Sequence, residues 1–142
     1  MIRAERAYVR DLVYVLRHPS EQTRLDLRDF TPAEALDRAL GWLAGAVTFH
    51  IDGRPAAVFG FVDESAPVKI TWFVATQAYF AGGGPVMRFT RRFLATWAAG
   101  RAIKTASWNR HPSAARWFKM LGYVVEAEKN GQVIYAYDHR SR

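Results

Sequence analysis

Apolar residues recur along the chain at two spacings, alternate positions and helical positions, and these spacings predict a mixture of strands and helices. Residues 2–5 form a short strand-like stretch, and residues 7–17 repeat apolar side chains at helical spacing. The segment "TPAE" predicts a second helix, running to about Gly45, because Thr31 can cap its first turn and Glu34 completes a capping box.

The rest of the chain predicts a meander of strands, a helix that follows a run of glycines, and a final hairpin. "AVTFHI" and "PAAVFGFV" flank a strong Asp-Gly turn at 52–53, and "VKITWFVA" follows the break "DESAP". Helices are expected over about 85–99 and 112–122, with the strand "AIKTASW" between them. "YVVEAE" and "VIYAYD" flank an Asn-Gly turn at 130–131. The order β-α-α-β-β-β-α-β-α-β-β indicates an α/β fold with a largely antiparallel sheet and one β-α-β crossover.

Composition narrows the classes of function. At 142 residues we expect one domain, residues 1–142, and the hydrophobic share of 50% excludes a disordered tail. No apolar run reaches the roughly 18 residues of a membrane span, and the start lacks the apolar region of a signal peptide, so we expect a cytoplasmic protein. The absence of cysteine excludes disulfides and thiolate metal sites, and no other metal-binding cluster is evident.

The net charge of +7 is compatible with a nucleic acid, an anionic ligand such as a phosphorylated cofactor, or simple solubility. The basic residues are mostly arginines spread along the chain, without a dense lysine tract. We therefore do not expect nucleic acid to be the primary partner.

Three consecutive glycines, residues 82–84, separate a strand from a basic helix in "FVATQAYFAGGGPVMRFTRRFLATW". Glycines let the backbone approach a ligand closely, and a helix N-terminus offers unpaired N–H groups to an anion such as pyrophosphate. A tight turn is the simpler interpretation. The Walker pattern is excluded because Gly84 is followed by Pro85, and the dinucleotide fingerprint because position 87 is Met87.

Two motifs resemble the GNAT superfamily of acyl-CoA-dependent N-acyltransferases. In that family a strand ending in Val precedes Gln/Arg-x-x-Gly-x-Gly/Ala and a helix; here Val74, Tyr79, Gly82 and Gly84 occupy these places. The later family motif, roughly Asn-x-x-Ala-x-x-Phe-Tyr-x-x-x-Gly-Phe, aligns with "HPSAARWFKMLGY". The element order is similar to the GNAT fold, a mixed and mostly antiparallel sheet with flanking helices, over nearly the whole chain.

The resemblance implies acetyl-CoA or another coenzyme A thioester as cofactor and an amine as acceptor. It implies that the glycine loop binds the pyrophosphate and that the pantetheine arm lies between two parallel, splayed strands, here those ending near Val74 and Trp108. The cofactor-binding positions that it implies are Phe73, Val74, Tyr79, Gly82, Gly83, Gly84, Arg88 and Asn109. Arg91 and Arg92 also follow the loop, and these arginines either neutralise phosphates or form a solvated helix face.

The catalytic residues depart from the family pattern. Amine acylation needs a base, a stabilised oxyanion and a proton for the leaving thiolate. The family's usual proton donor is a tyrosine, and this chain has Phe118 there; the strand before the loop also lacks a carboxylate. His111 and Glu64 are the candidate catalytic residues, although His111 also fits a residue before proline and Glu64, with Asp63, a turn. His50 is interpreted as a half-exposed strand residue.

A second resemblance implies a different function. Three segments, "TWFVAT", the basic helix and "SWNRHPSAARWFKMLGYVVEAEKNGQ", are similar to GNAT-like proteins of short-tailed phages. Those proteins are associated with virion assembly or the internal core proteins, and they also lack the tyrosine. That resemblance implies a catalytically inactive phage protein with virion partners, located in the bacterial host cytoplasm or in the virion. Two functions stay open: an N-acyltransferase, weak or specialised, and a structural or assembly protein on the same fold.

Overall fold

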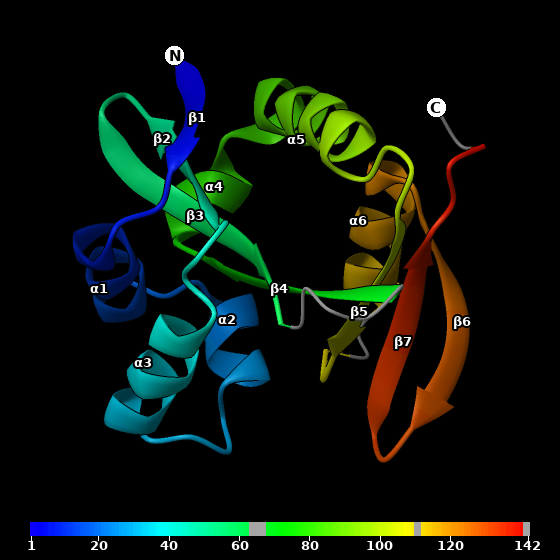
Figure 1. Cartoon of the computed structure of the whole chain (residues 1–142), viewed down its shortest axis with the longest axis horizontal. Helices are drawn as coiled ribbons and strands as arrows, with labels where there is room; N and C mark the ends of the chain where they lie inside the picture. The colour runs from blue at the N-terminus through cyan, green and yellow to red at the C-terminus, as the bar shows by residue number, and fades with distance from the viewer. Residues whose placement is uncertain (63–67, 110–111, 141–142) are drawn as a thin grey trace.

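The protein is built around one sheet with helices on both faces (Figure 1). The computed structural model describes residues 1–62, 68–109 and 112–140. Within them the sheet has seven strands in the order β1-β2-β3-β4-β5-β7-β6. Strands β4 and β5 are parallel, and every other neighbouring pair is antiparallel. The predicted α/β architecture with a mostly antiparallel sheet is confirmed.

Most predicted elements form close to their expected bounds. The strands are β1 Ile2–Arg6, β2 Val47–Ile51, β3 Arg54–Phe61, β4 Val68–Ala75, β5 Ala102–Ser107, β6 Tyr123–Lys129 and β7 Gln132–Tyr137. The helices are α1 Val9–Arg17, α2 Glu21–Asp26, α3 Pro32–Gly41, α4 Gln77–Ala81, α5 Gly83–Trp97 and α6 Pro112–Leu121. No helix among the described residues is long and apolar enough to cross a membrane.

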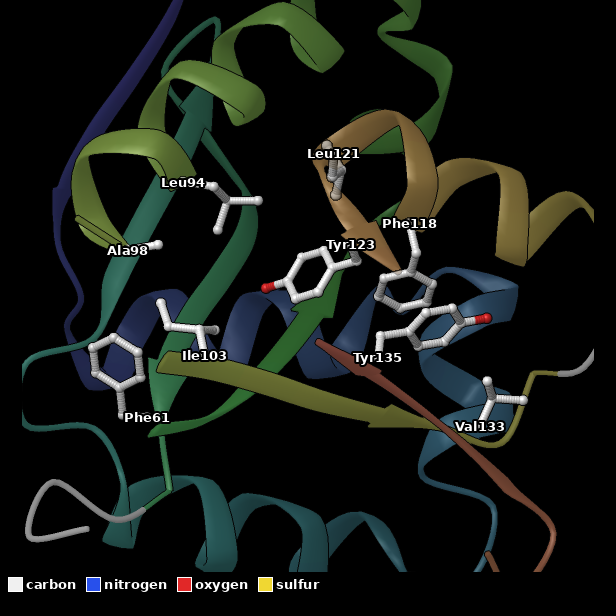
Figure 2. Close-up of a cluster of buried hydrophobic side chains, with 9 residues drawn as sticks. All are labelled: Phe61, Leu94, Ala98, Ile103, Phe118, Leu121, Tyr123, Val133 and Tyr135. Carbon is white, nitrogen blue, oxygen red and sulfur yellow. The ribbon is translucent and has the colours of Figure 1, made fainter. Parts of the chain in front are cut away.

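The helices form two layers. Helices α1, α2 and α3 lie together on one side of the sheet, and α5 and α6 lie on the other (Figure 1). On the first side, Leu12 and Val15 of α1 are buried with Val58 and Val74 of the sheet. On the second side, α5, α6 and the C-terminal strands enclose an aromatic and aliphatic cluster (Figure 2). Burial of these apolar faces is the main force that holds the layers together.

Both predicted hairpins are confirmed by their backbone angles. Asp52 and Gly53 have φ of 51° and 82°, and Asn130 and Gly131 have φ of 53° and 82°. Two successive positive φ values are what a tight turn between twisted antiparallel strands requires.

The sequence did not predict α2 or α4. It also placed the end of α3 near Gly45, whereas the helix ends at Gly41. Helix α4 lies between the strand and the glycines, where no element was predicted. Helix α2 has the greater consequence, because it lies beside the candidate site.

Candidate functional site

Strands β4 and β5 separate soon after they meet. They pair only over residues 68–70 and 102–104. Where the ladder stops, the Thr71 hydroxyl donates to the Lys104 carbonyl at 3.2 Å, and the Thr105 hydroxyl donates to the Thr71 carbonyl at 3.3 Å. No further pairing joins the two strands within the described residues. The expected parallel, splayed pair is confirmed.

Helix α2 is fixed to the end of β4. The backbone N–H of Ala75 donates to the Thr23 hydroxyl at 2.9 Å, and the N–H of Ser20 donates to the Ala75 carbonyl at 2.8 Å. The Ser20 side chain also caps α2 by accepting from the N–H of Thr23. These polar groups are buried, so their loss would leave unpaired donors and acceptors away from water.

Helix α2 is also fixed to the end of β5 and to the two residues that follow it. One carboxylate oxygen of Asp26 accepts from the Ser107 hydroxyl at 3.0 Å and from the Trp108 N–H at 3.2 Å. The Asn109 amide donates to Gln22 at 2.7 Å. Helix α2 thus spans the gap between the diverging strands. We call the opening the window: it is bounded by the two threonines, Thr71 and Thr105, at one end and by α2 at the other.

Phe73 presents its backbone to the window. The Ile70 carbonyl accepts from the N–H of Val62, just after β3, and the Thr76 N–H donates to the Ala56 carbonyl of β3. Alternation along β4 therefore turns the odd-numbered residues toward β5. Thr71 and Ala75 are already bonded on that side. The intervening N–H and C=O of Phe73 have no partner among the described residues. An unpaired backbone pair on a strand edge is a ready site for an extended ligand that carries amide groups.

A groove of about 260 Å³ passes through the window and reaches both faces of the sheet. Its wall on the α1–α3 side is mainly apolar and includes Leu27, Phe30, Ala39, Trp42 and Trp72. Its wall on the α5–α6 side includes Phe73, Trp117, Phe118, Leu121 and Tyr123. The window therefore connects two chambers on opposite faces of the sheet.

Asp26 is the one carboxylate among the described residues that line this groove. Burial raises the pKa of Asp26, and its hydrogen bonds with Ser107, Trp108 and Gln22 offset only part of that effect. All three partners are neutral, and no described cation forms an ion pair with it. Sequence reasoning missed Asp26, which lies in "TRLDLRDF" at the end of an unpredicted helix, and no motif there distinguishes it from its neighbour Asp29.

Phe118 lies on the α5–α6 wall, where the family pattern places a tyrosine. Its ring stacks on Tyr135 with centroids 4.1 Å apart and planes 20° from parallel (Figure 2). Two tyrosines lie beside it with their hydroxyls pointing in opposite directions (Figure 2). Tyr123 bonds the Thr71 side chain, and burial raises its pKa. Burial also raises the pKa of Tyr135, and the charges of Asp26 and Glu128 raise it further.

The glycine loop forms the start of α5, and its glycines have different roles. A Cβ on Gly82 would collide with the Val86 side chain, so close packing requires glycine there. Gly83 has φ of 65°, in the left-handed region that favours glycine. A Cβ on Gly84 would meet only the flexible end of Arg88, at 3.1 Å.

A second cavity of about 470 Å³, the α5 pocket, lies at this helix start. Gly83, Gly84, Arg88 and Arg91 line it, and the first turn of α5 contains no acidic residue. Trp117 lines both this pocket and the groove, so the two cavities are neighbours. The positive end of the helix dipole and two guanidinium groups make the pocket suitable for an anion.

The other residues that the sequence predicted for the site have different surroundings. The Tyr79 side chain is buried, its hydroxyl is 2.8 Å from that of Thr90, and its pKa is raised by burial. Val74 lines the groove with a buried side chain. Asn109 supports α2, as described above. His111 and Glu64, together with Asp63, lie outside the described residues.

His50 is more buried than the sequence suggested. Its Nε2 lies 3.7 Å from a carboxylate oxygen of Asp11, away from the groove. The described residues contain no cluster of His, Cys, Asp and Glu that would hold a metal ion.

No protein-family model matches the chain, and no curated protein sequence matches it. Solved structures do match it in three dimensions. The GNAT domain of S. lividans PAT has a TM-score of 0.70 at 16% identity, over 96% of this chain and 89% of that one. Aminoglycoside acetyltransferase AAC(6')-Ib, in complex with coenzyme A and kanamycin, has a TM-score of 0.69 at 13% identity, over 99% and 95%. PaiA N-acetyltransferase from Thermoplasma acidophilum, in complex with coenzyme A, has a TM-score of 0.66 at 9% identity, over 96% and 98%. From β1 to β7, this chain has the GNAT fold.

Proposed function

We propose that the protein transfers an acyl group from a coenzyme A thioester to an amine. The observation that carries this proposal is the unpaired backbone N–H and C=O of Phe73 on the open edge of β4. Pantetheine contains two amides, and an extended chain laid along that edge would complete the interrupted ladder. Both of the acetyltransferase complexes named above contain coenzyme A, which supports the same choice of ligand.

The proposed cofactor path runs from the window to the α5 pocket. The pyrophosphate would accept from the N–H groups at the start of α5, near Gly83 and Gly84, and Arg88 would neutralise part of its charge. Gly82 would act through packing and Tyr79 through its backbone, because the Tyr79 hydroxyl already contacts Thr90. Val74 would contact the pantetheine through its side chain, and Asn109 would help by holding α2 in place.

The proposed chemistry occurs in the window. A thioester whose carbonyl lies at Phe73 would receive a hydrogen bond from that N–H as negative charge develops on its oxygen. The amine would attack from the chamber on the α1–α3 side. Phe118 cannot protonate the leaving thiolate, but a thiol with a pKa of about 8.5 leaves tolerably as an anion. His111 and Glu64 remain candidate proton carriers.

The test is binding of acetyl-CoA, measured by calorimetry on wild type and Gly84→Glu. The variant adds a negative charge where the phosphates would lie, while its Cβ meets only the movable end of Arg88, so we expect a folded protein with no measurable binding. Gly41→Glu is the matched control, because it adds the same charge at an open position outside both cavities. Equal heats from wild type and Gly84→Glu, or none from wild type, would refute the proposal.

The alternative function, an inactive phage virion or assembly protein, is favoured by Phe118 in place of the tyrosine and by the lack of a carboxylate on β4. None of the structures named above is a phage protein. The same calorimetry separates the two functions, because a purely structural protein has no reason to retain acetyl-CoA binding at the glycine loop.

A further inference from the structure

The chamber on the α1–α3 side of the window has a composition that restricts its ligand. Phe30, Trp42 and Trp72 give it flat aromatic walls, and Leu27 and Ala39 complete an apolar surface. The rings of Trp42 and Trp72 lie 6.4 Å apart. Among the described lining residues, Asp26 and Arg38 are the only charged ones. A ligand that fills this space must be mainly apolar.

The two charges occupy different positions in the fold. Asp26 lies at the window, held there by Ser107 and the Trp108 N–H. Arg38 is exposed on α3, and its guanidinium carbon lies 4.8 Å from the centroid of Phe30. The negative charge therefore lies in the same groove as Phe73, where the thioester is proposed to bind, and the positive charge is beside Phe30 at the aromatic end of the chamber.

Asp26 has capacity for one more donor. A carboxylate offers about four acceptor sites. Asp26 uses three, for Ser107, Trp108 and Gln22, and its three donors are all uncharged. A carboxylate that is half-buried without a counter-charge binds a cation favourably, since the cation supplies the charge that the protein lacks.

We propose that the acceptor is a primary amine carried on a flat apolar body with a single positive charge, and that Asp26 binds its ammonium group and removes a proton. This inference rests on the proposed acyltransfer. The aromatic body would lie between Phe30, Trp42 and Trp72. Arg38 would repel a second positive charge at the far end of the ligand. A polyamine or an aminosugar fits poorly, because its further ammonium and hydroxyl groups would have no carboxylate to bind and would face apolar walls.

One proton passes from the ammonium to the Asp26 carboxylate, which leaves a neutral amine with a free electron pair. That pair forms the C–N bond at the thioester carbon, and the C–S bond breaks. The second proton of the nitrogen ends on the thiolate of coenzyme A, and Asp26 returns its proton to water. The products are an amide, a free thiol and one proton.

The experiment measures acetyl-CoA-dependent acylation of 2-phenylethylamine, with spermidine and kanamycin as polycationic comparisons. We expect kcat/KM for 2-phenylethylamine to exceed that for either polycation by about tenfold or more. A discrimination of this size is typical when one group of the poorer substrate has no matching contact in the pocket. Asp26→Asn should lower kcat for 2-phenylethylamine by about 10²-fold or more, the usual contribution of a positioned base. Its affinity for acetyl-CoA should stay within about twofold of wild type.

Two controls separate proton removal from a merely structural role. Asp29→Asn changes an exposed carboxylate of the same segment and should leave kcat unchanged. O-benzylhydroxylamine has a similar shape, but its nitrogen is uncharged at neutral pH, so it needs no initial deprotonation. The deficit of Asp26→Asn should be much smaller with this acceptor. An equal deficit with both acceptors would overturn the role of Asp26 as a base.

The outcomes distinguish this inference from the proposed function. If wild type binds acetyl-CoA and acylates spermidine better than 2-phenylethylamine, the acceptor class is wrong and acyltransfer stands. If the chamber instead prefers long-chain acyl-CoA thioesters over acetyl-CoA, it holds the acyl chain, and the acceptor class is again wrong. If no variant binds any coenzyme A thioester, both the proposed function and this inference fail.

Discussion

Phe118 lies on the wall of the groove, at the position where the family pattern has a tyrosine, and it lacks the hydroxyl of that tyrosine. Its ring stacks on Tyr135. Phe118→Tyr keeps that stack and returns a proton donor to the groove. We expect turnover with a good amine to rise by as much as about 10²-fold, the lower end of general acid catalysis. Acetyl-CoA affinity should not change, because Phe118 does not line the α5 pocket, where the phosphates are proposed to bind.

Steady-state kinetics and calorimetry on Phe118→Tyr would check this expectation. Phe61→Tyr is a matched control, since Phe61 also lies in a buried aromatic stack, with Trp97, but does not line the groove. If Phe118→Tyr binds acetyl-CoA normally and is no faster than wild type, protonation of the thiolate does not limit the reaction.

Asp26 should make folding stability depend on pH. Its pKa is raised in the folded chain, mainly by burial, so the folded state favours the protonated carboxyl. The stability from that protonation is fully present below the unfolded pKa of about 3.9 and is lost as pH rises through the folded pKa. Asp26→Asn has no such proton to lose. Urea unfolding should therefore show that the free energy of unfolding of Asp26→Asn, relative to that of wild type, increases from about pH 4 to about pH 7. A difference that is constant with pH would contradict this account.

Among the elements, α2 controls the geometry of the window. Thr23→Val should remove the hydroxyl that accepts from the Ala75 N–H, and this loss should destabilise the fold by about 1–3 kcal/mol. It should also lower acyltransfer, because α2 would no longer be fixed to β4. Denaturant unfolding and activity at a temperature where the variant is folded would measure both effects.

Thr31→Ala is the control variant for Thr23→Val. Thr31 caps α3 at an exposed position, so its loss should cost about 1 kcal/mol and leave activity unchanged. If Thr23→Val and Thr31→Ala affect activity equally, stability alone explains both, and α2 has no separate role in shaping the window.

The elements also show why the sequence predicted the fold well and the site only in part. Hairpins at 52–53 and 130–131 follow from local backbone chemistry, which a pattern reports directly. Helix α2, with the sequence "EQTRLD", has almost no apolar face, and its buried polar groups reach distant strands. Such tertiary hydrogen bonds leave no periodic signal. Asp26 was missed for the same reason, while Phe73 was predicted from the family resemblance.

At the scale of the whole molecule, a net charge of +7 should strengthen the binding of acetyl-CoA, the proposed anionic substrate, more than the binding of the proposed amine acceptor. The Debye length shrinks from about 10 Å at 0.1 M salt to about 3 Å at 1 M. We expect the dissociation constant for acetyl-CoA to increase steadily with salt, since charge attraction to Arg88 and Arg91 is screened. The KM for 2-phenylethylamine should change much less. Calorimetry and kinetics over a salt series would test this, and a salt-independent acetyl-CoA affinity would argue against the α5 pocket as a phosphate site.

The way α2 spans the window also sets when the site can exist during folding. The bond from Ala75 to Thr23 joins residues 52 positions apart, and the bond from Asn109 to Gln22 joins residues 87 positions apart. Contacts of such long sequence separation form late, because a long loop must close before they gain any energy. During synthesis α2 leaves the ribosome early and must wait for β5 to follow. A nascent chain that ends before residue 109 could form the hairpin of β2 and β3, yet it would lack one side of the window.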